Sequence, residues 1–166
     1  MSSLATTSLS TTAPSPFLAI LWGGLACGVL DITQACVAWG IQNHVPPYRI
    51  FQSVASGLLG AKSFQGGAQS AALGLFLHFL IAFIWAVIYY VASRQIAFLT
   101  ARPVIAGLIY GEFVWVMMNC VVVPLSAIHR WPPRLDPAGV ITGPILHPVL
   151  VGLPIALAVG RWAPRA

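Results

Sequence analysis

Charged side chains are scarce in this chain of 166 residues. Only 7% of its residues are charged and 58% are hydrophobic, and its mean hydropathy is +0.88. A soluble domain usually carries about 25% charged residues. Eight basic and three acidic side chains cannot cover a 17.6 kDa globule in water. The composition therefore excludes a soluble enzyme and a disordered chain, and it predicts a polytopic integral membrane protein.

Paired cysteines and clustered basic residues are also missing. The three cysteines (Cys27, Cys36 and Cys120) are odd in number and lie inside apolar runs, so they do not indicate a disulfide framework or a zinc site. The net charge of +5 comes from basic residues scattered between the apolar runs, whereas nucleic-acid binding needs a clustered patch. We therefore expect no nucleic-acid partner. Scattered basic residues are typical of side chains that anchor helices at lipid headgroups.

Sequence motifs of catalysis are absent as well. The chain has no Gly-x-Ser-x-Gly elbow, no phosphate-binding loop and no His-Glu-x-x-His pair. We therefore expect that the protein is not an enzyme.

Four apolar stretches are each long enough to cross a hydrocarbon core of about 30 Å as a helix. They cover residues 17–41, 68–92, 103–125 and 140–160. The sequence therefore predicts an all-α bundle of four transmembrane helices, in one domain from residue 17 to 166. The Ser-, Thr- and Pro-rich residues 1–16 are predicted to form a flexible tail. The last stretch contains Pro144, Pro148 and Pro154, which predict a bent or broken helix.

A shorter apolar segment lies between the first two stretches. Residues 50–61 are bracketed by Arg49 and Lys62 and are too few to span a bilayer as a helix. We expect an interfacial or re-entrant segment here. Most Trp and Tyr residues, with Trp85 among them, are interpreted as interfacial aromatic anchors near span ends.

The orientation in the membrane is almost undetermined by charge. The two sides of the predicted bundle carry four basic residues each. The second loop and the C-terminal tail are short, and the positive-inside rule weighs short loops most. This slightly favours cytoplasmic termini.

The two halves of the chain share three motifs in the same order. Gly24-Leu25-x-x-Gly28 matches Gly107-Leu108-x-x-Gly111, and a His followed by Pro-Pro occurs at His44 and at His129. The third match is Gly74 to His78 with Gly143 to His147. These matches predict a two-plus-two internal repeat with a pseudo-twofold axis along the membrane normal. Chance matching in an apolar, glycine-rich sequence is the alternative.

Each predicted span contains one ionisable side chain near its middle. Asp31, His78, Glu112 and His147 each lie within about three residues of the midpoint of a span, or roughly 5 Å along the helix axis. Asn119 shares a helix face with Glu112. A charged carboxylate at the centre of a bilayer costs about 2.5–3.5 kcal/mol on the mildest scales, so such groups usually face the bundle interior. The pattern predicts a polar layer at mid-depth.

Glycines flank this layer at helical spacing, which is typical of helix packing in lipid. The predicted packing glycines are Gly24, Gly28, Gly74, Gly107, Gly111 and Gly143.

The layer has three interpretations. It can consist of hydrogen bonds that hold the helices together, or it can be a route for a proton or cation in which the carboxylates titrate and the histidines relay. Alternatively, His78 and His147 are candidate ligands of a divalent metal or of haem b. No tight metal-binding spacing supports the third interpretation.

Several runs of the sequence form a recognisable set: Ala55 to Gly60, Phe64 to Gly67, Leu73 to Phe79, Met118 to Ser126 and Val151 to Leu157, together with His147. In these runs the chain resembles a group of small, uncharacterised bacterial inner-membrane proteins. The resemblance extends over most of residues 20–160. It implies a four-helix protein of the bacterial inner membrane and supplies no substrate, cofactor or active residue.

The leading functional expectation is a small transport or permeation protein for a proton, an ion or a small solute. The alternatives are a haem- or metal-binding redox or sensor subunit and a structural accessory subunit of a larger membrane complex. We expect the lipid bilayer as one partner, and further copies of the chain or a membrane complex as others.

Overall fold

The computed structural model describes residues 15–129 and 137–163, and this part of the chain is all-α with no strand. Four helical segments in it are long and apolar enough to cross a membrane: Pro16–Asn43, Gly67–Ser93, Pro103–Leu125 and Ile141–Trp162. The prediction of four span-length helices in an all-α fold is therefore confirmed, with boundaries close to those expected.

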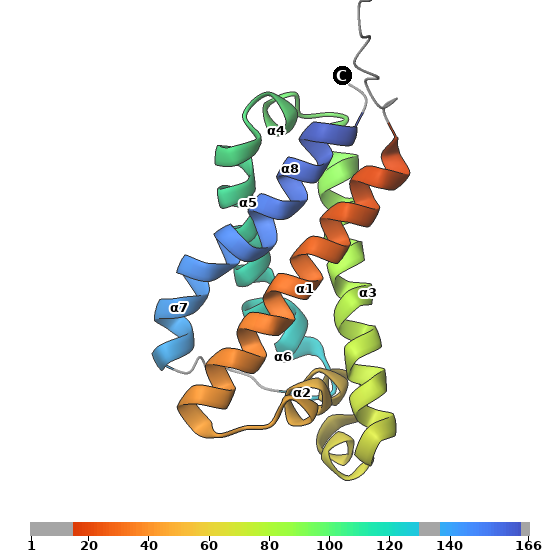
Figure 1. Cartoon of the computed structure of the whole chain (residues 1–166), viewed down its shortest axis with the longest axis vertical. Coiled ribbons are helices and arrows are strands. Elements are labelled where there is room, and N and C mark those ends of the chain that lie inside the picture. Colours follow the sequence, from red (N-terminus) through yellow and green to blue (C-terminus); the bar gives the residue numbers. More distant parts are fainter. Residues whose placement is uncertain (1–14, 130–136, 164–166) are drawn as a thin grey trace, which may run out of the picture.

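The span-length helices lie side by side along the long axis of the molecule (Figure 1). α1 packs against α3 and α8, and α5 packs against α8 and η3. η1 is a 3₁₀ helix, and η2 and η3 are π-helical. In chain order the elements are α1 (Pro16–Asn43), α2 (Pro47–Leu59), η1 (Gly60–Gln65), α3 (Gly67–Ser93), α4 (Phe98–Ala101), α5 (Pro103–Met117), η2 (Met118–Val122), α6 (Val123–Leu125), α7 (Pro137–His147), η3 (Pro148–Gly152) and α8 (Leu153–Trp162).

The first span begins where the sequence supplies a helix cap. The Leu18 N–H donates to Ser15 Oγ at 3.3 Å, and Pro16 opens the helix, where a missing N–H costs nothing. The Ser15 N–H also donates to the Trp162 carbonyl at 2.7 Å. The start of α1 and the end of α8 therefore lie together at one end of the bundle (Figure 1). The tail was predicted to extend to residue 16, but Ser15 caps the helix and Pro16 is already helical. Residues 1–14 of the predicted tail lie outside the described residues.

Two histidines adopt the same unusual backbone conformation after the first and third spans. His44 has φ 55° and His129 has φ 46°, and no other non-glycine residue in the described ranges has a positive φ. The His44 N–H donates to the Gly40 carbonyl at 3.1 Å, and the His129 N–H donates to the Ser126 carbonyl at 3.0 Å. These are the histidines of the repeated His/Pro-Pro motif. The shared turn supports the internal repeat, which stays a hypothesis; the second Pro-Pro pair lies outside the described residues.

The short segment predicted between the first two spans forms α2 and η1, with α2 beginning at Pro47. Figure 1 shows α2 at the end of the bundle opposite the beginning of α1. Gln52 is 1% exposed, and its Nε2 donates to the Gly67 carbonyl at 3.0 Å and to Ser70 Oγ at 3.2 Å. A Cβ at Gly74 would collide with the backbone of Phe51. Thus α2 packs closely on α3, while its interfacial or re-entrant position in a membrane stays a prediction.

The third and fourth spans both contain a π-helical turn. η2 ends two residues before Pro124, and η3 ends two residues before Pro154. A proline cannot donate to the carbonyl four residues earlier, so the regular α-helical ladder is interrupted just before it. The fourth span is therefore irregular at η3, near the prolines that predict a break, but it stays helical from Ile141 to Trp162. The π-helical turn of the third span is not predicted by the sequence.

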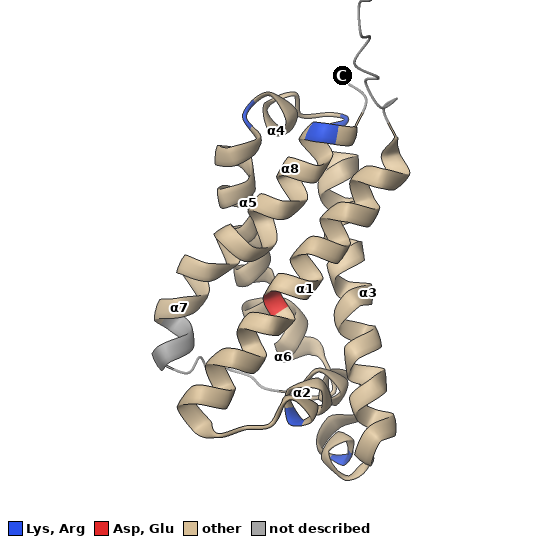
Figure 2. Ribbon diagram, in the orientation of Figure 1, with Lys and Arg blue, Asp and Glu red and all other residues tan. Residues whose placement is uncertain are grey.

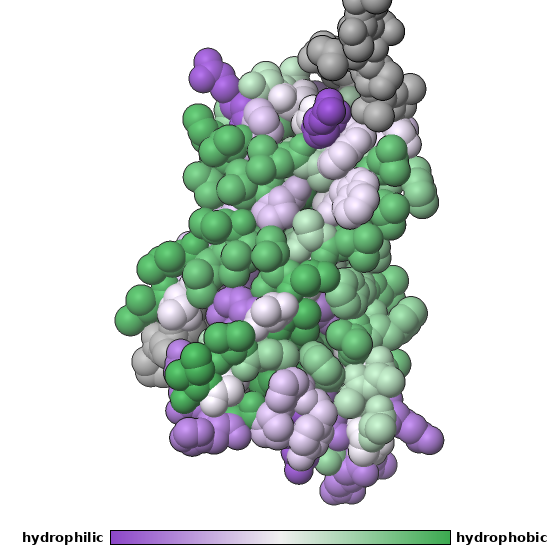
Figure 3. All heavy atoms as spheres, viewed as in Figure 1, coloured by the Kyte–Doolittle hydropathy of each residue, from purple (hydrophilic) through white to green (hydrophobic). Residues whose placement is uncertain are grey.

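Polar and apolar side chains are separated along the long axis. Figure 2 shows the visible basic residues at the two ends of the bundle and an acidic position near the middle of α1. The surface between the ends is mainly hydrophobic, with a small hydrophilic area at mid-height of this face (Figure 3). This distribution fits four membrane-spanning helices with a polar site at mid-depth.

Candidate functional site

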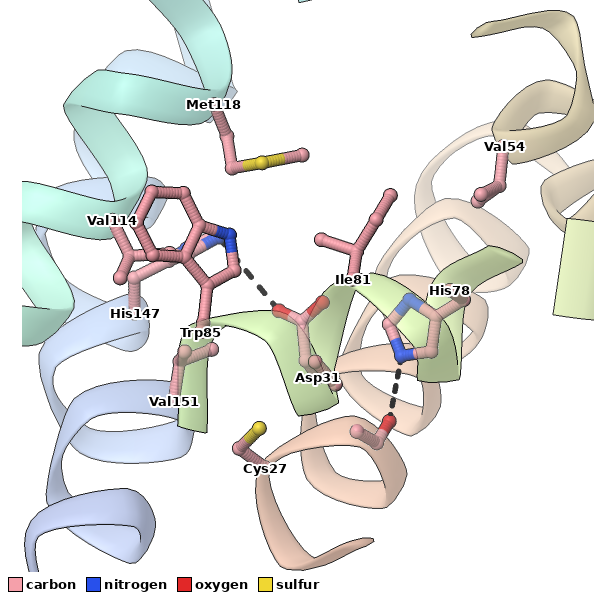
Figure 4. A pocket seen from close by; sticks show the side chains of 12 residues that line it. Cys27, Asp31, Val54, His78, Ile81, Trp85, Val114, Met118, His147 and Val151 are labelled. Atoms are coloured by element: carbon pink, nitrogen blue, oxygen red, sulfur yellow. Dashed lines mark hydrogen bonds and ion pairs between the residues drawn. The ribbon is translucent and has the colours of Figure 1, made fainter. Parts of the chain in front are cut away.

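A cavity of about 200 Å³ opens among the helices around Asp31 (Figure 4). All four span-length helices contribute to its wall, and Val54 of α2 reaches it from one end of the bundle. The residues that line it are Cys27, Gly28, Asp31, Val54, His78, Ile81, Ala82, Trp85, Val114, Met118, His147 and Val151.

Helical periodicity explains how these residues share one cavity. Cys27 and Asp31 are one turn apart on α1, and Val114 and Met118 are one turn apart across the junction of α5 and η2. Residues four positions apart lie on the same face of a helix. Each span therefore turns one narrow face toward the cavity.

Asp31 and His147 form the ionisable pair of the cavity. Their Oδ1 and Nε2 atoms are 3.8 Å apart, too far for a hydrogen bond but close enough for an ion pair when the imidazole is protonated. The side chains are 28% and 24% exposed, respectively. Among residues 15–129 and 137–163, no Lys or Arg lines the cavity. With a neutral His147, the Asp31 carboxylate is the only charge that these residues place in the cavity wall.

His78 lies on the other side of the Asp31 carboxylate in Figure 4, and it is held by the backbone of α1. Its Nε2 is 2.8 Å from the Gly28 carbonyl oxygen. A carbonyl only accepts, so Nε2 carries the proton and donates. In the neutral ring, Nδ1 is then an acceptor. His78 thus links α3 to α1 through Nε2, and its Nδ1 is a hydrogen-bond acceptor on a residue that lines the cavity.

The structure does not bring the other two predicted polar residues into the cavity. Glu112 is partly buried on α5 but is not part of the cavity wall. It follows Gly111, whose Cα faces the backbone of His147 and Pro148, and one residue further along a helix is about 100° around the axis. Asn119 Nδ2 donates to the Trp115 carbonyl at 2.9 Å within its own helix. The polar layer at the cavity is therefore made of Asp31, His78 and His147.

The predicted packing glycines lie against neighbouring helices. Gly24 and Gly28 of α1 face Phe83 and Phe79 of α3. Gly107 of α5 faces Gly152 and Ala156, and Gly143 of α7 faces the Trp115 indole.

Trp85 is a cavity residue that the sequence interpretation assigned to the interface. It is only 8% exposed, and it belongs to the buried core. Its position follows His78 by seven residues, two turns along the same face, and that spacing was the available signal. The position of Trp85 along the axis of α3 suggests a span end. The face of α3 on which Trp85 lies, and not that position, determines whether the side chain is buried.

An aromatic cluster supports Trp85 from α5. The Tyr110 hydroxyl donates to the Trp85 carbonyl at 2.7 Å, and the two rings meet edge to face with centroids 6.3 Å apart. Phe113 meets the Trp85 ring at 6.1 Å and an interplanar angle of 90°. These contacts hold the Trp85 side chain and link α3 to α5.

Both π-helical turns border the cavity. Met118, the first residue of η2, lines the cavity. His147, which directly precedes η3, and Val151, which lies within η3, also line it. π-helical turns occur frequently at functional sites. Here they aim residues of the third and fourth spans at Asp31.

The cavity does not have the ligand set of a metal centre. In residues 15–129 and 137–163, no three His, Cys, Asp or Glu side chains are grouped so that they could hold a metal ion. The Nε2 of His78 is already engaged by the Gly28 carbonyl, so it is not free to ligate a haem iron in this arrangement. The geometry therefore gives no support to His78 and His147 as metal or haem ligands.

No family model, curated protein or solved structure matches this chain.

Proposed function

We propose that the protein is a small multi-pass transport protein of the bacterial inner membrane that moves protons through the Asp31 cavity. The observation that carries this proposal is the Asp31–His147 pair, with 3.8 Å between Oδ1 and Nε2, in a cavity at mid-depth of four apolar helices. Asp31 is the proton carrier, and His147 is the group that exchanges the proton with it.

The energetics of the pair suit a carrier better than a purely structural contact. A carboxylate inside an apolar bundle is expensive unless it is paired or protonated. Asp31 is paired with His147 at a distance longer than a hydrogen bond. Neither protonation state is therefore locked by a dense network. The carboxyl can be neutral when protonated, and it can be ionised when His147 carries the proton.

The exposure of the pair supports access to it. Asp31 and His147 keep 28% and 24% of their side-chain surface accessible. A residue that only holds helices together would gain from complete enclosure, because hydrogen bonds strengthen in a drier environment.

The test is proton flux in liposomes that contain the purified protein and a trapped pH-sensitive dye. A potassium diffusion potential drives the flux. We expect a dye response faster than that of protein-free liposomes for the wild type, a return to the protein-free rate for Asp31→Asn, and a wild-type rate for Glu112→Gln. The Glu112 variant is the matched control, because it removes an acid of the same membrane bundle that does not line the cavity.

Two outcomes would contradict the proposal. One is a wild-type flux equal to that of protein-free liposomes, with the protein shown to be folded by its melting transition. The other is an Asp31→Asn variant that conducts as fast as the wild type.

A further inference from the structure

We propose that the Asp31 cavity also binds a small organic ammonium ion, which competes with the proton held by the Asp31–His147 pair. This inference rests on the proposed function, because it names a second ligand of the same cavity. Its test measures binding without any transport, so the two proposals can fail separately.

The charge of the cavity wall selects a cation. With neutral histidines, Asp31 contributes a charge of −1, and no Lys or Arg in the described part of the chain lines the cavity to compensate it. His78 donates through Nε2 to the Gly28 carbonyl, which makes its Nδ1 an acceptor. The wall therefore offers carboxylate oxygens and an imidazole acceptor but no fixed cationic donor. An ammonium group supplies the missing donors and the missing charge.

The remaining wall selects apolar substituents on that cation. Trp85 offers the aromatic face that attracts cations best, and Ile81, Val114, Met118 and Val151 are apolar. A hydrated inorganic cation would have most of its bound water in contact with these apolar side chains, which cannot form hydrogen bonds to it. In addition, the described residues hold no group of three metal ligands. An alkylated ammonium ion places its substituents on the apolar wall and its charge beside Asp31.

The volume fits an organic ion of a few heavy atoms. The cavity of about 200 Å³ is much larger than the roughly 10–15 Å³ that a single water requires on a comparable measure. Figure 3 shows a hydrophilic area at mid-height of an otherwise hydrophobic face. Such an area is compatible with entry of a cation that carries apolar substituents.

Exchange with a proton follows from the same geometry. The titratable groups that line the cavity are Cys27 and Asp31 from α1, His78 from α3 and His147 from α7, while α2, α5, η2 and η3 contribute Val54, Val114, Met118 and Val151. When His147 is protonated, it pairs with Asp31 and the cavity is neutral. When His147 loses that proton, the ammonium ion can take its place beside the carboxylate. Binding of the cation therefore releases a proton, and lower pH weakens binding by up to about tenfold per pH unit.

The experiment is calorimetric titration of the purified full chain in detergent. The probe is choline, and the control is 3,3-dimethylbutan-1-ol, which has nearly the same shape but a carbon in place of the charged nitrogen. Sodium chloride at equal concentration controls for ionic strength. We expect saturable binding of choline alone, with a weaker affinity at pH 5.5 than at pH 7.5.

Three variants locate the binding. Asp31→Asn should weaken choline binding by about tenfold or more, because a charge-assisted contact is lost. Trp85→Phe should weaken it by about two- to fivefold, since the cation then faces a poorer aromatic ring. Glu112→Gln should leave it unchanged, because Glu112 does not line the cavity.

Equal binding of choline and its neutral analogue would overturn the proposal, because charge would then play no part. Choline binding by wild type that Asp31→Asn leaves intact would also overturn it. The comparison between the charged and neutral probes uses only the wild-type protein, so it decides the question even when a variant fails to fold.

Discussion

His78 and His147 occupy matching positions in the two halves of the sequence, each four residues after a glycine, but their surroundings differ. His78 sits in the unbroken helix α3 and donates to the Gly28 carbonyl at 2.8 Å. His147 ends α7, directly before a π-helical turn, and its Nε2 faces the Asp31 carboxylate at 3.8 Å. The same residue type therefore serves a structural bond in one half and an ionisable pair in the other.

The helix contacts behind these histidines show where the difference arises. In the first half, Gly28 of α1 faces the Phe79 ring of α3. In the second half, Gly111 of α5 faces the backbone of His147 and Pro148. Phe79 and Pro148 are equivalent in the proposed repeat, since each directly follows its histidine. The Phe79 ring lies between α1 and α3, whereas the backbone of α5 directly approaches the backbone at the end of α7. This close approach occurs beside the π-helical turn η3, where His147 faces Asp31.

The largest effect is expected where backbone opposes a glycine. Gly74→Ala would place a methyl group into the Phe51 carbonyl of α2, and overpacking of this kind costs about 1–3 kcal/mol. Gly143→Ala should cost less, because its neighbour is the Trp115 side chain, which can move more easily than backbone. Thermal melting in detergent measures both. Gly40→Ala is the control, with no contact closer than 3.8 Å, and equal losses at positions 74 and 143 would contradict the comparison.

The next effect concerns the coupling of the two histidines to Asp31. A double-mutant cycle of Asp31→Asn with His147→Gln should give an interaction free energy of about 0.5–3 kcal/mol, because the two side chains face each other. The parallel cycle with His78→Gln should be close to additive, since His78 is bonded to backbone instead. Unfolding in detergent provides the free energies. Similar coupling in both cycles would mean that the two histidines are equivalent after all.

A smaller effect is expected from the hydrogen bond of His78 itself. His78→Leu should lower stability by about 0.6 kcal/mol, the average for such interhelical bonds in a membrane bundle. His78→Gln should restore most of the loss, because the amide nitrogen of Gln can donate where Nε2 does. Both variants should keep the proton flux in liposomes. Loss of flux in a stable His78→Gln protein would show that this histidine takes part in proton transfer.

The smallest effect is expected at Glu112. Glu112→Gln should change stability by less than about 0.5 kcal/mol and leave the pH dependence of the flux unaltered, because the side chain is outside the cavity wall. Melting curves and flux at several pH values test this. A stable Glu112→Gln protein with altered pH dependence would place the second acid on the proton route.

Much of the architecture could be predicted because length and apolarity alone determine a span. The sequence places Asp31, His78 and His147 near the middles of their helices, and the structure brings all three to one cavity. Depth does not give the angle around a helix axis, and this is why Glu112 was placed in the same layer although α5 turns it away from the cavity. The direction in which Glu112 points around the axis of α5 depends on the close approach of Gly111 to His147. This is a tertiary contact that the sequence around Glu112 does not indicate.

Two cavity residues show what a better use of periodicity could have provided. Trp85 lies two turns from His78, and Met118 lies one turn from Val114, so helical spacing already links them to the cavity faces. The π-helical turn at Met118 could not be read in the same way. A single proline such as Pro124 is compatible with a helix end, a kink or a π-helical turn, and the packing of neighbouring helices decides among them.

The π-helical turn η3 has a further consequence for the angular registration of the fourth span. A π-helical turn holds more residues than an α-helical turn, so the residues before it and after it are out of phase with a single continuous α-helix. Ile155 and Val159, which pack in the core, and His147, which faces Asp31, therefore belong to two rotational settings of one span. Deleting one residue between 148 and 152 would let the span become uniformly α-helical while both parts keep their facing, whereas substitutions that make η3 α-helical without a deletion would rotate one part against the other by about 100°. Either the core would keep its packing and Asp31 would lose its partner, or the pair would persist at the expense of the core.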